Sequence, residues 1–140
     1  KALEVTRQTG RPYSSFLSGE KKERPFRVIR MALHVEREQL YRRINRRVEK
    51  MVEAGLVEEA GRLLPMRHYN AMKTVGYREM FQYLEGILSL DEAVDLIQRN
   101  TRKYARKQIT WFRKYDRYPW FAPEDTDAML AHIENERNRG

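Results

Sequence analysis

The stretch from Ser89 to Tyr115 contains neither Gly nor Pro and lies within the longest run of the chain without either residue, 87–118. Glu92 follows Ser89 by three residues, which is the spacing of a capping box at a helix N-terminus. The stretch therefore predicts one long helix, and the chain as a whole is expected to be mostly helical. Apolar and aromatic positions recur every three to four residues and predict its buried stripe: Val94, Ile97, Thr101, Tyr104, Gln108, Trp111 and Tyr115.

Other segments also have helical periodicity. The helix predicted over residues 37–54 places four apolar side chains on one face: Leu40, Ile44, Val48 and Met51. Gly55 ends it, because glycine commonly follows the last helical residue. Further helices are predicted over residues 1–9, 56–64, 76–84 and 127–138. Loops are predicted over residues 13–24, 66–75 and 119–123.

Residues 25–35 are the one convincing strand, because β-branched and large apolar residues dominate them. Ile29, Met31 and Leu33 alternate onto one face. A lone strand cannot satisfy its own backbone donors and acceptors. We therefore expect its partner strands to lie outside this chain. In the chain by itself, we expect the unpaired strand either to drive self-association or to be poorly ordered.

Composition limits the classes of function. The 140 residues carry a formal net charge of +8 and no cysteine, which excludes disulfides and thiolate metal sites and suits a reducing cytoplasm. No apolar run reaches the roughly 20 residues of a membrane span. A basic chain of this size fits nucleic acid, although anionic lipid or simple solubility also accounts for the charge.

The long helix carries the strongest basic signal. Eight basic residues lie between Arg99 and Arg117, with Asp116 as the one acid among them. Arg99, Arg102, Arg106 and Arg113 are predicted to lie near one face at helical spacing. A row of one charge sign is favourable where it meets phosphates; the alternative is a solvated basic face.

A second basic cluster follows the strand. Arg43, Arg47 and Lys50 lie beside the apolar face of the helix over residues 37–54, where guanidinium groups can reach a cleft and bind a pyrophosphate in fork geometry. The alternative is that these arginines pair with acids elsewhere in the fold.

A third candidate site is the loop that enters the helix over residues 76–84. Free N–H groups at a helix N-terminus attract phosphate, and Tyr77 could stack on a base. Ordinary helix capping explains the same residues equally well. The segment comprises Lys73, Thr74, Val75, Gly76, Tyr77 and Arg78.

Other catalytic patterns are absent from the sequence. The three histidines are isolated, so neither a zinc site nor a His-based triad is expected. The phosphate-binding motif G-x-x-x-x-G-K-[ST] does not occur. No metal ligand is therefore predicted in this chain.

Four segments, in order and with matching spacing, resemble the bacterial tRNA dimethylallyltransferases. They read KALEVTRQTGRP, REQLYRRINRRVEKMVEAGLVEE, MKTVGYREMFQYLEG and RNTRKYARKQITWFRKY. The resemblance implies the C-terminal part of a P-loop-type α/β core together with the end of a helical insertion. Residues 1–20 would end the tRNA-binding insertion, 21–122 would belong to the catalytic core, and 123–140 would be a tail with a short helix. Because the chain opens at Lys1 inside an apparent helix, we expect a truncated or processed protein.

The resemblance also implies the reaction. Family members transfer a dimethylallyl group from dimethylallyl diphosphate to the exocyclic amine of the adenine 3′ of the anticodon, with Mg²⁺ beside the diphosphate. The implied partners are the tRNA anticodon stem-loop and dimethylallyl diphosphate, with no membrane, and the complete enzyme is expected to be a monomer. The family's phosphate-binding loop and general-base aspartate lie N-terminal to the segment matched here. We therefore expect this chain alone to be inactive.

Site residues are assigned by position. Arg47 matches the catalytic arginine that contacts the diphosphate, and Arg43 is assigned to the diphosphate with it. The tRNA-binding assignment, which includes Arg102 from the basic face, comprises Lys1, Lys73, Thr74, Val75, Gly76, Tyr77, Arg78, Arg102, Arg106, Lys107, Gln108, Ile109, Thr110, Trp111, Phe112 and Arg113. The alternatives are a non-catalytic helical RNA-binding module and a membrane-surface protein, the second disfavoured by the many charges.

Overall fold

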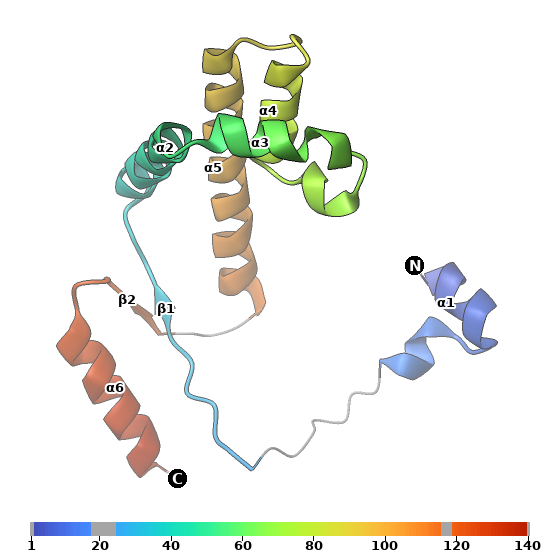
Figure 1. Ribbon diagram of the computed structural model, residues 1–140. Coiled ribbons are helices and arrows are strands. Elements are labelled where there is room, and N and C mark those ends of the chain that lie inside the picture. Colours follow the sequence, from blue (N-terminus) through green and yellow to red (C-terminus); the bar gives the residue numbers. More distant parts are fainter. Residues whose placement is uncertain (1, 18–24, 116–118, 140) are drawn as a thin grey trace.

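A computed structural model describes residues 2–17, 25–115 and 119–139, and the helices dominate it (Figure 1). The described elements are α1 (Ala2–Thr9), β1 (Ala32–Leu33), α2 (Arg37–Glu53), α3 (Leu56–Leu63), α4 (Tyr77–Leu84), α5 (Leu90–Tyr115), β2 (Trp120–Phe121) and α6 (Thr126–Asn138). Short 3-10 turns occur at Tyr13–Phe16, Leu64–Met66 and Asn70–Lys73. The mostly helical prediction is therefore confirmed, and the predicted helices are present within one or two residues of their expected ends.

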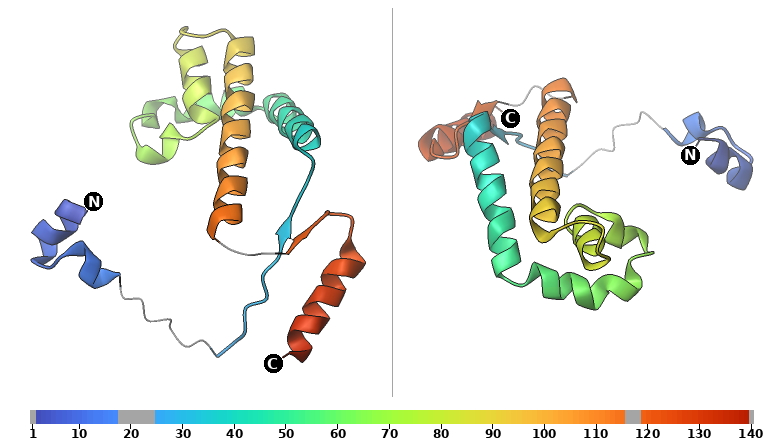
Figure 2. Two further views of the ribbon diagram at one scale, coloured as in Figure 1. Left: turned by 180° about the vertical axis from the view of Figure 1, so that it is seen from behind. Right: turned by 90° about the horizontal axis from the view of Figure 1, so that it is seen from above.

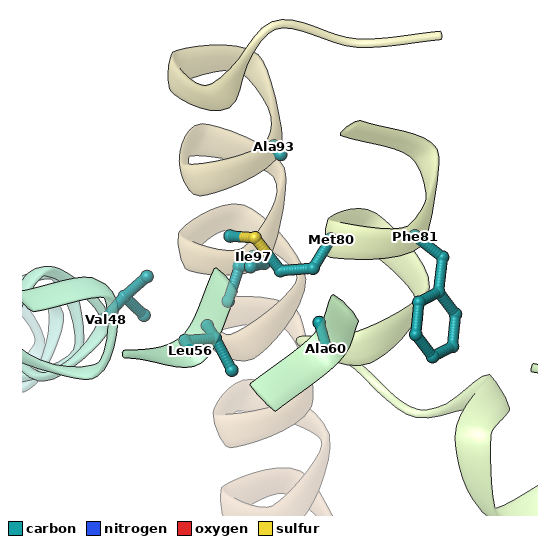
Figure 3. Packing of buried hydrophobic residues seen from close by; sticks show 7 residues of the cluster. All are labelled: Val48, Leu56, Ala60, Met80, Phe81, Ala93 and Ile97. Atoms are coloured by element: carbon teal, nitrogen blue, oxygen red, sulfur yellow. The ribbon is translucent and has the colours of Figure 1, made fainter. Parts of the chain in front are cut away.

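The core lies where α2, α3 and α4 pack against the first half of α5. It is built from Val48, Leu56, Ala60, Met80, Phe81, Ala93 and Ile97 (Figure 3). Gly55 makes the sharp turn between α2 and α3 with a φ of 97°, a left-handed conformation that side chains disfavour. Because the turn is short, Val48 on α2 and Leu56 on α3 contribute to the same core.

The long helix is capped as predicted. The Ser89 backbone N–H donates to Glu92 Oε2 at 2.7 Å, and the Glu92 N–H donates to Ser89 Oγ at 3.2 Å. The N–H of Ser89 and then its side chain lower the pKa of Glu92, because both favour the charged carboxylate. The helix therefore starts where the sequence places it.

The predicted buried stripe of this helix is correct only in its first half. Ile97 is buried and Val94 and Thr101 are half-buried, but Tyr104 is 61% exposed and Trp111 is 50% exposed. Gln108 is also exposed. The reason is that α4 packs beside only the N-terminal part of α5 and α2 meets α5 on one side, so much of the surface of the second half has no helix against it (Figure 1). The Tyr115 side chain lies outside the described part.

The strand prediction over residues 25–35 is wrong in its length and in the location of its first partner. Only Ala32–Leu33 form a strand, and β1 pairs in parallel with β2, with Ala32 opposite Trp120 and Leu33 opposite Phe121. The segment over 119–123, predicted to be a loop, thus supplies a strand within the chain. The three residues between Pro119 and Pro123 give no alternating pattern long enough to predict a strand. Whether strands from outside the chain pair with residues 25–35 stays a prediction.

The two terminal helices have few contacts. α1 has no buried residue and lies apart from the other helices in all three views (Figures 1 and 2). α6 is tied to the segment before β1 by an ion pair between Arg27 Nη2 and Glu136 Oε2 at 3.2 Å. The division at residues 20 and 122 stays a prediction. Every described helix is too short or too polar to cross a bilayer.

Candidate functional site

A cleft of about 530 Å³ lies between α2, α5 and the loop before α4. Its lining is Ile44, Arg47, Val48, Met51, Lys73, Thr74, Val75, Ile97, Thr101 and Tyr104. Ile44, Val48 and Ile97 are buried and give the cleft an apolar floor, while Arg47 and Lys73 are exposed cations at its margin. The cleft thus brings together residues predicted separately for a diphosphate and for tRNA.

A buried carboxylate fixes the loop that forms one wall of the cleft. Glu79 is 1% exposed and accepts hydrogen bonds from the Gly76 N–H at 2.9 Å, Asn100 Nδ2 at 2.9 Å and Arg78 Nη2 at 2.5 Å. Burial raises the pKa of Glu79, but these hydrogen bonds together outweigh burial and hold it below its ordinary value. Gly76 is itself buried with a φ of 107°, so the loop turns into α4 through a conformation that suits glycine.

The residues just before this turn are held less tightly. Lys73 Nζ donates to Asn70 Oδ1 at 3.3 Å, and the Thr74 hydroxyl donates to the Ala71 carbonyl at 3.3 Å. The side chains of Lys73, Thr74 and Val75 are all exposed. Backbone and side-chain groups of this loop are therefore accessible at the margin of the cleft.

Tyr77 has a packing role in this structure. Its hydroxyl donates to Glu59 Oε1 on α3, and its ring lies 6.2 Å from the Phe81 ring at an interplanar angle of 17°. The hydrogen bond to Glu59, then burial and the charge of Glu59, raise the pKa of Tyr77. Base stacking by Tyr77 stays a prediction.

The basic residues of α2 form a second hollow that adjoins the cleft. It measures about 380 Å³ and is lined by Arg43, Arg46, Arg47, Lys50, Met51 and Ala54. Arg43 has an exposed ion pair with Glu124 at 3.9 Å, so the alternative that this arginine pairs with an acid holds in part. In the part of the chain that is described, no acidic side chain pairs with Arg47. Arg47 lines both hollows and connects them.

The second half of α5 presents a basic face to solvent. A shallow hollow of about 630 Å³ is lined there by Lys103, Arg106, Lys107, Thr110, Trp111 and Lys114. A smaller hollow beside it, of about 390 Å³, is lined by Tyr104, Lys107, Gln108, Trp111 and Phe112. Exposed cations therefore alternate with exposed aromatic rings along this part of the helix.

Helical spacing keeps Arg102, Arg106 and Arg113 near one side of α5, but the side chains of Arg102 and Arg113 contact protein groups. Arg102 Nη1 donates to Asn45 Oδ1 on α2 at 2.6 Å, and its guanidinium lies 5.9 Å from the centre of the Tyr41 ring. The Arg113 guanidinium lies 5.8 Å from the centre of the Trp120 ring. Long side chains at the edge of a helix face reach neighbouring elements, which helical spacing alone does not predict.

Other predicted residues are divided between the two sides of α5. Gln108, Ile109 and Phe112 line an apolar groove of about 370 Å³ against β1 and Trp120. Lys1 lies outside the described residues. Tyr104, predicted from the periodicity to be buried, is an exposed lining residue of the cleft that was not among the predicted site residues. Tyr104 lies seven residues after the buried Ile97 and therefore on the same side of α5. This spacing could have indicated that Tyr104 lines a cleft next to the core.

Comparison with known proteins identifies the family. Residues 1–115 match the sequence profile of the IPP transferase family. The chain belongs to this family. Similar curated IPP transferases include tRNA dimethylallyltransferase 2 of Parabacteroides distasonis, 51% identical over 94% of the chain, and the protein of the same name in Porphyromonas gingivalis, 55% identical over 94% of the chain. The chain spans 44% of the length of each relative and corresponds to their C-terminal part.

Solved structures agree with the assignment. The tRNA delta(2)-isopentenylpyrophosphate transferase of Staphylococcus epidermidis superposes with a TM-score of 0.74 at 28% identity, over 99% of this chain and 47% of that one. The full-length tRNA isopentenylpyrophosphate transferase of Bacillus halodurans gives 0.71 at 38% identity, over 88% of this chain and 41% of that one. The fold of this chain is therefore that of the matching part of IPP transferases.

Proposed function

We propose that this chain is the tRNA-holding part, and one side of the diphosphate site, of an enzyme that prenylates tRNA. The complete enzyme would transfer a dimethylallyl group from dimethylallyl diphosphate to the exocyclic amine of the adenine 3′ of the anticodon. Family membership supports the reaction class. The observation that carries the proposal for this chain is the cleft that joins Arg47 to Lys73, Thr74 and Val75.

The chemistry of the cleft suits a short allylic diphosphate. An apolar floor matches the five-carbon chain, and the exposed cations Arg47 and Lys73 match the phosphates. As the allylic carbon–oxygen bond breaks, its electron pair stays on the leaving diphosphate, and the amine nitrogen forms the new bond to carbon. A guanidinium held near that oxygen stabilises the transition state more than the ground state. We assign this role to Arg47, with Arg43 as a second diphosphate contact.

The proposed tRNA surface has two parts. One is the loop from Lys73 to Arg78, and the other is the exposed side of α5 around Arg106, Lys107, Thr110 and Trp111. Lysine and arginine would contact phosphates, and exposed rings would contact unpaired bases. A tRNA substrate would place the complete enzyme in the cytoplasm.

Magnesium beside the diphosphate belongs to the proposal only at the level of the family. Magnesium beside a diphosphate is usually held by one or two carboxylates as well as the phosphates, but no Asp or Glu lines the cleft or the hollow beside it, and no group of three metal-ligating side chains occurs among the described residues. The residues here therefore do not fit a magnesium site, and no step is assigned to the metal. The alternative function is a non-catalytic RNA-binding module. It would not explain why Arg47 lines the same cleft as the loop residues Lys73, Thr74 and Val75.

The decisive experiment compares Arg47→Ala with Arg106→Ala in the complete enzyme. Removing one donor to a developing charge typically costs about a hundredfold in rate. Arg47→Ala is expected to lower the single-turnover rate by about that factor while tRNA affinity stays near that of the unaltered enzyme. Arg106→Ala is expected to weaken tRNA binding and to leave the rate at saturating tRNA nearly unchanged.

Arg46→Ala is the matched control, because Arg46 lies on the same helix and lines the basic hollow but not the cleft. It should retain most of the single-turnover rate. If Arg47→Ala reduced only tRNA affinity, or if Arg46→Ala slowed the chemical step as strongly, the assignment of Arg47 to the diphosphate would be wrong.

A further inference from the structure

Tyr104 is an exposed aromatic residue in a position that connects two hollows. It lines the cleft with Arg47, Lys73 and Val75, and it also lines the hollow with Lys107 and Trp111. Its side chain is 61% exposed. Within the described ranges its hydroxyl makes no hydrogen bond and its ring stacks on no other ring. The ring therefore does not hold the fold together.

The charges around Tyr104 indicate the kind of ligand. The cations that line the two hollows are Arg47 and Lys73 in the cleft and Lys107 in the other hollow, and no acidic side chain lines either one. A flat, exposed ring between cations matches an unpaired nucleotide, because the base stacks on the ring while phosphates meet the cations. A purely apolar protein partner would leave those cations without counter-charges.

We propose that Tyr104 stacks on an unpaired base of the tRNA anticodon loop, next to the cleft in which the adenine is modified. This inference rests on the proposed function and names a binding residue that it did not include. Stacking tolerates any base, because each has a π face. Tyr104 therefore holds the loop in place and does not read its sequence.

The test measures binding of a synthetic anticodon stem-loop to the 140-residue chain, with unaltered protein, Tyr104→Phe and Tyr104→Leu. Stacking on one base typically changes affinity by about tenfold or more. Tyr104→Leu should weaken binding by that factor, and Tyr104→Phe should bind like the unaltered chain, because it retains the ring. The slope of log Kd against log salt should stay the same in all three, since Tyr104 carries no charge.

The control variant is Tyr69→Leu. Tyr69 is 57% exposed, its ring lies 4.2 Å from the His68 ring at an interplanar angle of 35°, and it lines neither hollow. It should bind the stem-loop like the unaltered chain. Abasic substitution at each loop position in turn identifies the stacked base, because at that position Tyr104→Leu should cause no further loss.

The possible outcomes separate this inference from the proposed function. If the unaltered chain bound no stem-loop, the tRNA-holding role of the chain and the inference would both fail. If it bound, but Tyr104→Leu matched it or Tyr104→Phe was as weak as Tyr104→Leu, only the stacking role would fail. If every abasic stem-loop still lost affinity with Tyr104→Leu, the ring would contact some other part of the RNA, and base stacking would be wrong.

Discussion

At the scale of single residues, Glu79 shows how one buried charge can position a functional loop. Its carboxylate joins the N-terminus of α4 to Asn100 on α5, and the loop that it holds forms one wall of the cleft. A buried carboxylate is costly unless hydrogen-bond donors surround it, and here three residues supply them. The same residue therefore couples stability to the shape of the site.

We predict that Glu79→Gln destabilises the chain at pH 7 by about 1–3 kcal/mol, since it replaces an acceptor by a donor beside Asn100 and Arg78. The folded-state pKa of Glu79 lies below its ordinary value of 4.5. Its contribution is therefore complete above that value and is lost as the pH falls through the lower, folded-state pKa. Urea unfolding at pH 7 and at lower pH should show the difference between the two proteins shrinking with acid.

Glu58→Gln is the control for Glu79→Gln, because Glu58 is exposed on α3. It should change the free energy of unfolding little at either pH. A difference between Glu79→Gln and the unaltered chain that stayed constant down to pH 3 would contradict a role for the ionised carboxylate.

At the scale of elements, α5 combines two functions in one helix. Its first half packs against α2 and α4, and its second half carries exposed cations and rings beyond them. A helix can extend past its packing partners because its backbone hydrogen bonds are made within the helix. The exposed half is therefore available to a ligand without loss of the core.

The charge on this half of α5 leads to a salt-dependence prediction. Arg106→Gln with Lys107→Gln should weaken binding of the anticodon stem-loop and reduce the slope of log Kd against log salt by about two, if each residue contacts one phosphate. The double variant Arg62→Gln with Arg137→Gln removes the same charge from exposed positions outside both hollows of α5. Equal slopes for the two double variants would show that the phosphate contacts do not lie on this half of α5.

At the scale of the whole molecule, the two-stranded sheet is the least complete part. Parallel strands usually occur in sheets that are covered on both faces, yet Leu33 in β1 is 55% exposed and Val28 just before it is 48% exposed. Within the described residues, β1 pairs with β2 alone. An exposed strand edge with apolar side chains favours pairing with another chain.

We predict that the chain self-associates at high concentration through this edge. Leu33→Lys should shift sedimentation towards the monomer, since a charged side chain at a strand edge opposes edge-to-edge pairing. Ile87→Lys is the control, because Ile87 is 64% exposed in the turn between α4 and α5, far from β1 in the fold. A chain that is monomeric at every concentration, or an equal effect of both variants, would exclude the strand edge as the contact.

The sequence by itself determined the helices, their ends and the basic character of the surface. Helical hydrogen bonds and caps join residues three or four positions apart. The pair Ser89 and Glu92 was therefore sufficient to predict where α5 begins, and the spacing of Ile44 and Val48 was sufficient to predict the buried face of α2. The resemblance of four sequence segments was sufficient to identify the family. It also nominated Arg47 and the loop from Lys73 to Arg78, whose roles stay predictions.

The tertiary structure decided everything that depends on partners distant in sequence. No pattern of neighbouring residues in the sequence predicts these contacts. Examples are the pairing of Ala32 with Trp120, the hydrogen bond from Arg102 to Asn45, and the position of Arg47 and Lys73 in one cleft. Periodicity predicted a buried Tyr104 because it records which face an apolar residue occupies. Whether that face is covered depends on where α4 ends and on which side of α5 α2 lies, and only the packed chain fixes this.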